Sequence, residues 1–258
     1  MKKLKLITTL LALLIVLMGC KKETPTGVVG PTGLTCSFVY SAWTPCSNTT
    51  QTRTYTTSPS GCSGTPPADS TQRSCVMVKI GDQIWTLTNL DVATYRNGEV
   101  IPQVQDANAW SNLRTGAWCY YLNNTANGTS YGKLYNWYAV NDPRGLAPTG
   151  YHIPTDAEWT TLTTYLGGET AAGTKMKSTS GWLNNGNGTN TSGFAGLPGG
   201  CRYADGNFSN IGDKGYWWSS SENYTYFAWC RFLDGNYGNV YRSNYLKQDG
   251  ISVRCLRD

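Results

Sequence analysis

Apolar residues at every second position mark the start of the first regular element of the chain. Val76, Val78 and Ile80 recur with the period of a strand, and a Gly-Asp turn follows at 81–82. The apolar pattern resumes with Ile84. We therefore expect a strand, a tight turn and a second strand at this point.

Short apolar runs predict further elements up to the end of the chain. Residues 106–113 are typical of a short helix. Loops rich in Asn, Gly, Ser and Thr, such as 184–193, separate the elements. Late strands are expected at 215–221, 227–233 and 251–258. The pattern predicts one domain over residues 76–258, with few helices and short strands.

The stretch 150–159, GYHIPTDAEW, contains the only histidine in the chain. Thr155 and Glu158 are three residues apart, which predicts a capping box at a helix start. The apolar face of this helix is expected at Trp159, Leu162 and Leu166. Gly167-Gly168 follow and indicate the helix end.

The two acidic residues near His152 therefore have structural roles of their own. Glu158 belongs to the capping box, and Asp156 suits the positive end of the helix dipole. No nucleophile adjoins the histidine. We expect His152 to be a structural residue, neither a general base nor a metal ligand.

Residues 1–19 have the pattern of an export signal. The basic start MKKLKL precedes an uncharged apolar run that is too short to span a bilayer. The run ends in LMGC, which resembles the lipobox of bacterial lipoproteins. This resemblance implies cleavage before Cys20, acylation of that residue and stable attachment to a membrane. The alternative is an ordinary secretory signal followed by a chance cysteine.

Loss of this signal changes the charge of the chain. It removes Lys2, Lys3 and Lys5 and lowers the formal net charge from +5 to +2. No cluster of Lys and Arg remains, which argues against nucleic acid as a partner. We expect a protein of the cell envelope, with the outer membrane as its site, either periplasmic or exposed on the surface.

Two segments precede the main domain. Residues 20–35 have no apolar period and are expected to form a lipid-anchored, flexible tether. Residues 36–75 hold almost no aliphatic side chains, so disulfides must hold them together. The cysteines of this segment are Cys36, Cys46, Cys62 and Cys75.

Trp43 and Arg53 suggest what kind of module residues 36–75 form. An Arg plane can stack on a Trp ring and replace a core layer. The pattern W-x-x-C followed by T-R-T resembles the thrombospondin type-1 repeat, a thin module of three strands. The match is partial, because that family usually has six cysteines and more than one Trp. The alternative is a generic spacer stapled by disulfides.

Several motifs of the main domain occur together in one known family. They include VKIGDQIWTLTNLDV, YGKLYNWYAV, GLAPTGYHIPTDAEW, GYWWSSSE and GISVRCLRD. Together they resemble the Fibrobacter succinogenes major paralogous domain over nearly all of 76–258. The resemblance implies an α+β, C-type-lectin-like fold with an antiparallel sheet, one or two short helices and long loops. The resemblance also implies a relationship to the formylglycine-generating enzymes.

The resemblance also suggests how the remaining cysteines pair. Eight cysteines besides Cys20 are an even number in an exported chain, which indicates disulfides. In lectin-like folds a long disulfide ties an early element to the last strand, which implies Cys119–Cys255. Cys201 and Cys230 would then form the second disulfide of the main domain.

Three functions are compatible with a fold of this kind. An enzyme of the formylglycine-generating kind needs paired thiols in a context that Cys201, Cys230 and Cys255 do not reproduce. Calcium-dependent sugar binding needs ligand tripeptides that are not intact here, and Asn141-Asp142-Pro143 is more simply a turn. We therefore expect no enzyme activity, no cofactor and no metal.

The third function is recognition of a protein or glycan. Residues 223–245 hold five Tyr among Asn, Ser, Gly and Arg, a composition typical of binding surfaces. Core positions are expected at Trp217, Trp218, Trp229 and Val253. The ligand surface is predicted at Tyr226, Asn236, Tyr237, Tyr241, Arg242 and Tyr245.

Two other interpretations of this segment stay open. It resembles the variable region of proteins that diversity-generating retroelements mutate, which would make it a variable binding site. Tyr and Asn are also common in hairpins and edge strands of such folds, where they need not bind anything.

Overall fold

The computed structural model describes residues 77–258 with their side chains and the backbone of five short strands before them. The predicted signal, the lipidation site Cys20 and most of the tether lie outside the described residues. The side chains of four predicted disulfide cysteines also lie outside them, namely Cys36, Cys46, Cys62 and Cys75.

The described strands before residue 77 pair into two small sheets. β1 (Val28–Val29), β2 (Thr35–Tyr40) and β4 (Tyr55–Ser58) form an antiparallel sheet of three strands. β3 (Thr50–Thr52) pairs with β5 (Gln72–Ser74). This segment thus contains short strands, while its disulfides and its likeness to a thrombospondin type-1 repeat stay predictions.

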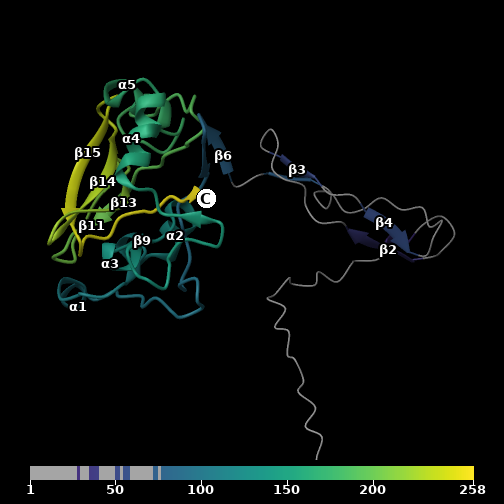
Figure 1. The fold of residues 1–258 in the computed structure, drawn as a ribbon, viewed down its shortest axis with the longest axis horizontal. Helices are drawn as coiled ribbons and strands as arrows, with labels where there is room; N and C mark the ends of the chain where they lie inside the picture. The colour runs from purple at the N-terminus through teal and green to yellow at the C-terminus, as the bar shows by residue number, and fades with distance from the viewer. Residues whose placement is uncertain (1–27, 30–34, 41–49, 53–54, 59–71, 75–76) are drawn as a thin grey trace, which may run out of the picture. The chain divides into compact units, whose positions relative to one another are not determined.

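The largest sheet of the domain has five strands in the order β12-β11-β13-β14-β15. Its strands are β11 (Gly199–Arg202), β12 (Phe208–Ile211), β13 (Lys214–Tyr224), β14 (Phe227–Asp234) and β15 (Val240–Leu246). Neighbours are antiparallel except β11 and β13, which are parallel. Figure 1 shows β13, β14 and β15 side by side in green and yellow. Two of the three expected late strands, at 215–221 and 227–233, are confirmed.

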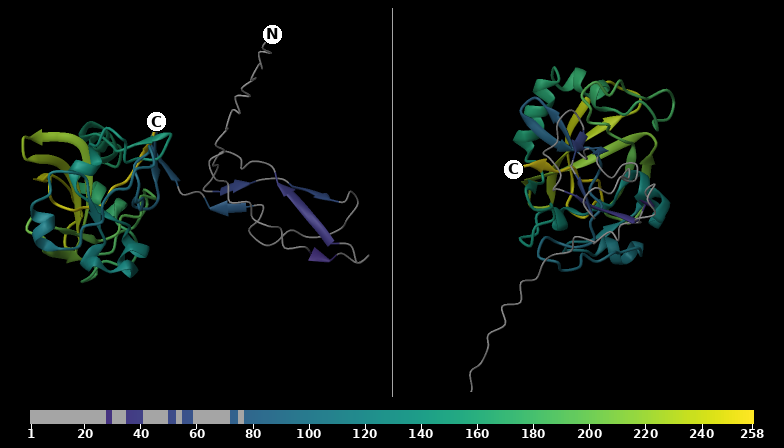
Figure 2. Two further views of the ribbon diagram at one scale, coloured as in Figure 1. Left: turned by 90° about the horizontal axis from the view of Figure 1, so that it is seen from below. Right: turned by 90° about the vertical axis from the view of Figure 1, so that its right-hand side faces the viewer.

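A second sheet brings the first and last strands of the domain together in the order β10-β16-β7-β6. β6 (Met77–Ile80) and β7 (Gln83–Thr86) confirm the predicted pair of strands around the turn at 81–82. Only β16 (Leu256–Arg257) forms within the strand predicted at 251–258, and it pairs with β10 (Tyr151–His152). In Figure 2 the C-terminus lies on the opposite side of the domain from β13–β15.

Short helices fill the space around the sheets. They are α1 (Ala107–Ser111), α2 (Thr125–Tyr131), α3 (Trp137–Val140), α4 (Asp156–Tyr165) and α5 (Glu169–Met176), with a 3₁₀ turn η1 (Tyr121–Asn123) and a small pair of strands β8 (Trp118–Cys119) and β9 (Leu134–Tyr135). α1 confirms the helix predicted at 106–113. α4 begins with the predicted capping box between Thr155 and Glu158. Figure 1 shows α4 and α5 together, apart from α1–α3.

Aromatic side chains fill both faces of the five-stranded sheet. Trp217 and Trp218 are neighbours on β13 and therefore point to opposite faces. Trp217 packs in one cluster with Trp159 of α4, and Trp218 packs in another with Val253. The predicted core positions Trp217, Trp218 and Val253 are confirmed as buried. Trp229 is only half-buried.

The α+β class predicted from the sequence is confirmed by these sheets and helices. Its likeness to the C-type-lectin fold stays a prediction. Within the described part of the chain, no helix has the length and apolarity needed to cross a membrane.

The four cysteines of the domain are buried, free thiols, so the predicted pairs Cys119–Cys255 and Cys201–Cys230 are not formed in the structure. Cys201 and Cys230 lie on β11 and β14, with β13 between them. Two strand spacings amount to about 9.6 Å, whereas a disulfide joins Cα atoms no more than about 7 Å apart.

Cys119 and Cys255 are separated for a different reason. On β8 the side chain of Trp118 points into the cluster that contains Cys255, so its neighbour Cys119 points to the other side. Burial raises the pKa of both thiols to about 12. They are therefore weak nucleophiles at neutral pH.

Candidate functional site

The six residues predicted to bind a ligand do not lie together in the structure. β14 and β15 form a hairpin in which Phe232 pairs with Tyr241, and Arg231 pairs with Arg242. Successive residues of a strand face opposite sides of a sheet. Tyr241 and Arg242 therefore belong to different surfaces.

Arg242 belongs to an ion-pair network between β15 and the start of α4. Its Nε and Nη2 atoms lie 3.0 and 2.9 Å from the two carboxylate oxygens of Asp156. Its guanidinium also stacks on Trp229, 3.4 Å from the ring centre. Arg231 donates to the same carboxylate at 2.7 Å. Burial alone would raise the pKa of Asp156, but the two guanidinium groups outweigh it and lower the pKa.

Tyr245 and Tyr226 lie elsewhere on the hairpin. Tyr245 packs into the core, with its ring centre 5.4 Å from that of Tyr216, and burial raises its pKa. Tyr226 lies in the turn between β13 and β14, where it is 67% exposed and its neighbour Tyr224 is 68% exposed. Tyr245 is thus half-buried against the core, and Tyr226 lies at the opposite end of β14 from Tyr237.

The other three predicted residues, Asn236, Tyr237 and Tyr241, lie together where β14 turns into β15. The ring of Tyr241 stacks on Phe232 with 4.6 Å between centres, and Tyr237 meets Tyr241 edge to face at 6.4 Å. Tyr237 is 57% exposed, while Tyr241 and Phe232 are half-buried. We call Asn236, Tyr237, Tyr241 and Phe232 the hairpin-tip surface.

The turn that carries the hairpin-tip surface is held by two lysines. Lys177, which follows α5, donates from Nζ to the backbone oxygens of Asp234 and Tyr237 at 3.0 and 2.9 Å. Lys214 pairs with the carboxylate of Asp234 at 3.0 Å. Oδ1 of Asp234 also accepts from the backbone N–H of Asn236 at 2.9 Å. These contacts hold the backbone of the turn, and a surface on a fixed backbone loses less entropy when it binds a partner.

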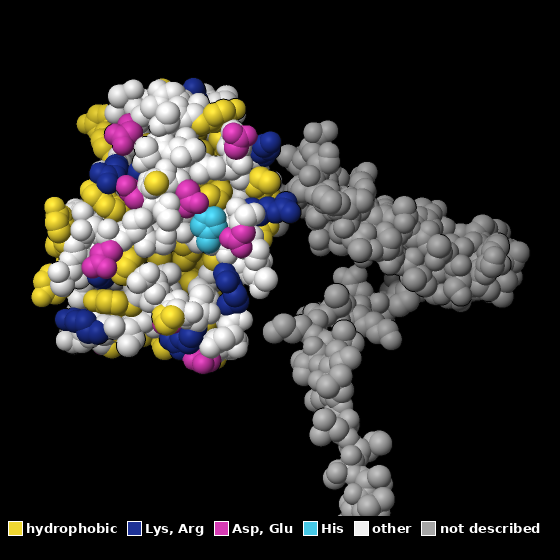
Figure 3. Space-filling view, in the orientation of Figure 1, with side chains coloured by type: hydrophobic (Ala, Val, Ile, Leu, Met, Phe, Trp, Pro, Cys, Tyr) yellow, Lys and Arg dark blue, Asp and Glu magenta, His cyan; other side chains and the backbone are white. Residues whose placement is uncertain are grey.

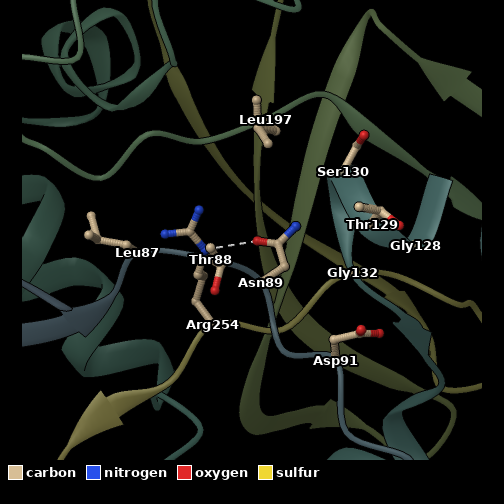
Figure 4. Close-up of a pocket in the computed structure, with 10 residues that line it drawn as sticks. All are labelled: Leu87, Thr88, Asn89, Asp91, Gly128, Thr129, Ser130, Gly132, Leu197 and Arg254. Atoms are coloured by element: carbon tan, nitrogen blue, oxygen red, sulfur yellow. Dashed lines mark hydrogen bonds between the residues drawn. The ribbon is translucent and has the colours of Figure 1, made fainter. Parts of the chain in front are cut away.

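A hollow of about 410 Å³ opens in another part of the domain. Figure 4 shows Arg254 and Asn89 side by side in it, Ser130 and Thr129 across from them, and Leu197 above. Arg254 is only 1% exposed. Its Nε atom donates to Oδ1 of Asn89 at 2.8 Å.

A family model described as the Fibrobacter succinogenes major domain matches residues 78–257. The chain belongs to this family. The match covers nearly all of the domain predicted at 76–258 and confirms the resemblance of its sequence motifs. No curated protein and no solved structure matches the chain.

His152 of the Fibrobacter major domain lies between two carboxylates. Its Nδ1 is 2.8 Å from Oδ1 of Asp258, and its Nε2 is 2.9 Å from Oε1 of Glu158. Figure 3 shows this histidine in cyan between two magenta acidic groups. Burial alone would lower the pKa of His152, but the two carboxylates outweigh it and raise the pKa. The histidine thereby joins the capping box of α4 to the C-terminal residue.

Some residues of these sites were not indicated by the sequence. Phe232 lies inside a predicted strand, and only the register of the hairpin places it beside Tyr241. Lys177 and Lys214 are far from the tip in sequence, so no local signal connects them to it. Among residues 77–258, no cluster of three or more His, Cys, Asp or Glu side chains is arranged to hold a metal ion.

Proposed function

We propose that the chain is a lipid-anchored protein of the bacterial cell envelope whose Fibrobacter major domain recognises a protein or glycan ligand without catalysis. The lipobox that ends at Cys20 supports the anchor. The proposal includes a C-type-lectin-like fold for the domain and a disulfide-stapled, thrombospondin type-1-like module at 36–75. Both rest on the sequence motifs.

The hairpin-tip surface is the observation that carries the recognition proposal. Tyr237 offers an exposed ring with one hydroxyl, and the stacked pair Tyr241 and Phe232 supports it from behind. Nδ2 of Asn236 donates to Oδ1 of Asp234 at 3.2 Å, and the side-chain oxygen of Asn236 can accept a hydrogen bond from a ligand. Rigid aromatic anchors beside short polar side chains are the chemistry of binding surfaces, because they supply contact area at a low entropic cost.

Two observations support a role without catalysis. The side chains that look catalytic in the sequence, His152, Glu158 and Asp156, are engaged in the capping box and in ion pairs. The thiols are buried, and burial raises the pKa of Cys201 to about 12. Such groups are poorly suited to act as nucleophiles at neutral pH.

The test compares two exposed tyrosines at opposite ends of β14: Tyr237 in the turn after it, and Tyr224 beside the turn before it. The full chain is applied to an array of glycans and cell-surface proteins, and the affinity for the strongest hit is measured for Tyr237→Ala and Tyr224→Ala. We expect Tyr237→Ala to weaken binding by about 2 kcal/mol, while Tyr224→Ala leaves it unchanged. The melting temperature should stay constant in both variants.

Two outcomes would contradict this proposal. If both variants bind like the unchanged chain, the hairpin-tip surface is not the binding site. If Tyr224→Ala alone loses binding, the site lies at the turn between β13 and β14 instead.

A further inference from the structure

The hollow beside Asn89 contains a buried cation without an anionic partner. The Arg254 guanidinium donates to Oδ1 of Asn89 and to the backbone oxygens of Thr86, Phe194 and Ala195. All four acceptors are neutral, so no carboxylate compensates the charge. A guanidinium has five N–H donors, and these four groups accept from only four of them. Burial lowers the pKa of Arg254 to about 9.

The remaining charges around the hollow cancel. Asp91 is the only carboxylate among the ten residues that line it. Lys133 pairs with Asp91, with 2.6 Å between Nζ and Oδ1. Lys133 does not line the hollow, but it gives Asp91 a cationic partner, whereas Arg254 has no anionic partner among the described residues. A negative group of a ligand would supply the partner that the fold does not provide.

The rest of the lining suits a hydroxylated molecule. Thr88, Thr129 and Ser130 are exposed at the rim, and their hydroxyls make no hydrogen bond with the described residues. Leu87 and Leu197 add apolar surface. Hydroxyl groups beside apolar side chains match a sugar ring, which has both hydroxyls and C–H faces.

We propose that this hollow binds a small hydroxylated carboxylate of the sugar-acid class, with its carboxylate on Arg254 and its hydroxyls at Thr129 and Ser130. The volume of about 410 Å³ lies within the range of about 300–1,000 Å³ that is usual for ligand pockets. The site is separate from the hairpin-tip surface and does not depend on the function proposed for that surface.

The indole of Trp217 provides a local readout of binding. Its Nε1 donates to Oδ1 of Asn89 at 2.8 Å, the same oxygen that accepts from Arg254. D-glucuronate is titrated into the full chain, with D-glucose as the uncharged counterpart, and the indole N–H signal of Trp217 is followed by NMR. We expect a saturable shift with glucuronate and no saturable shift with glucose.

Rim variants test the site without disturbing the buried guanidinium, whose removal would leave buried carbonyls without donors. Thr129→Ala combined with Ser130→Ala should weaken glucuronate binding by about fivefold or more, because two hydrogen bonds are lost. Thr125→Ala, in the same helix but outside the hollow, should leave the affinity unchanged. The proposal is overturned if glucuronate gives no saturable shift, if glucose binds equally well, or if the double variant keeps full affinity.

Discussion

At the scale of single residues, groups that look reactive in the sequence are held by structural partners. The raised pKa of His152 means that folding favours its charged form. This contribution to stability is fully present below the ordinary pKa of 6.5. It is lost as the pH rises through the higher pKa of the folded state.

His152→Gln should therefore remove a pH-dependent part of the stability. We expect the variant to lose about 0.5–1 kcal/mol at pH values below about 6, where the imidazolium is charged, because the pair is partly exposed. At alkaline pH the two proteins should unfold alike. Urea unfolding at both pH values measures the difference, and ligand binding serves as the control. A loss of binding at unchanged melting temperature would mean that His152 is part of a site.

Asp156 pairs with one buried and one exposed arginine. The Arg231 side chain is 1% exposed and that of Arg242 is 38% exposed. Asp156→Asn leaves a buried charge without its anion, so we expect a loss of about 3 kcal/mol or more. Arg242→Ala removes only the exposed partner and should cost about 1 kcal/mol. Equal losses in chemical denaturation would contradict the assignment of Arg231 as the buried partner.

At the scale of elements, the sequence predicts those elements whose structure is determined by residues close together in the chain. Thr155 and Glu158 are three residues apart, and the capping box between them needs no other part of the chain. The turn at 81–82 is similar, because Gly81 adopts a φ of 61°, which glycine permits. The sequence does not predict helices such as α2 and α3, because they have no clear apolar period.

The candidate site was predicted less well, because its geometry depends on register. Tyr241 and Tyr245 lie among Asn, Ser and Gly, a composition that does not indicate a strand, whereas residues 240–246 form β15. On this strand, the side chains of Tyr241 and Arg242 face opposite sides of the sheet. Arg254 could not be recognised either, because no pattern in the sequence shows that a charge lacks a partner.

Helix α5 packs against the turn that carries the hairpin-tip surface. A Cβ atom added at Gly173 would lie 2.3 Å from the backbone oxygen of Asn239. Gly173→Ala should therefore push α5 away from the turn, at a cost of about 1–3 kcal/mol that outweighs the gain of about 1 kcal/mol in helix propensity. We expect lower stability in urea unfolding and weaker ligand binding at the tip.

The matched control for this change lies in the same helix. Ala171→Gly should cost about 1 kcal/mol through helix propensity alone and leave ligand binding unchanged. If Gly173→Ala instead stabilises the protein, the helix and the turn do not approach each other as closely as described.

At the scale of the whole molecule, the proposed anchor makes a prediction about location. Cys20→Ser removes the thiol that acylation requires, so the variant should no longer incorporate labelled palmitate. It should also appear in the soluble fraction, because several acyl chains are what hold such a protein to a membrane. Unchanged labelling of the Ser variant would contradict the lipoprotein assignment.

The pairing of β6 and β16 with the same strand has a consequence for protein architecture. Val78 and Leu256 both lie opposite Trp85 on β7, one on each side. They are therefore only about 9.6 Å apart, two strand spacings. A polypeptide can enter and leave this domain through one small patch. We therefore expect that the domain can be inserted into a surface loop of a host protein. We also expect that a short linker can join its first and last strands in a circular permutant.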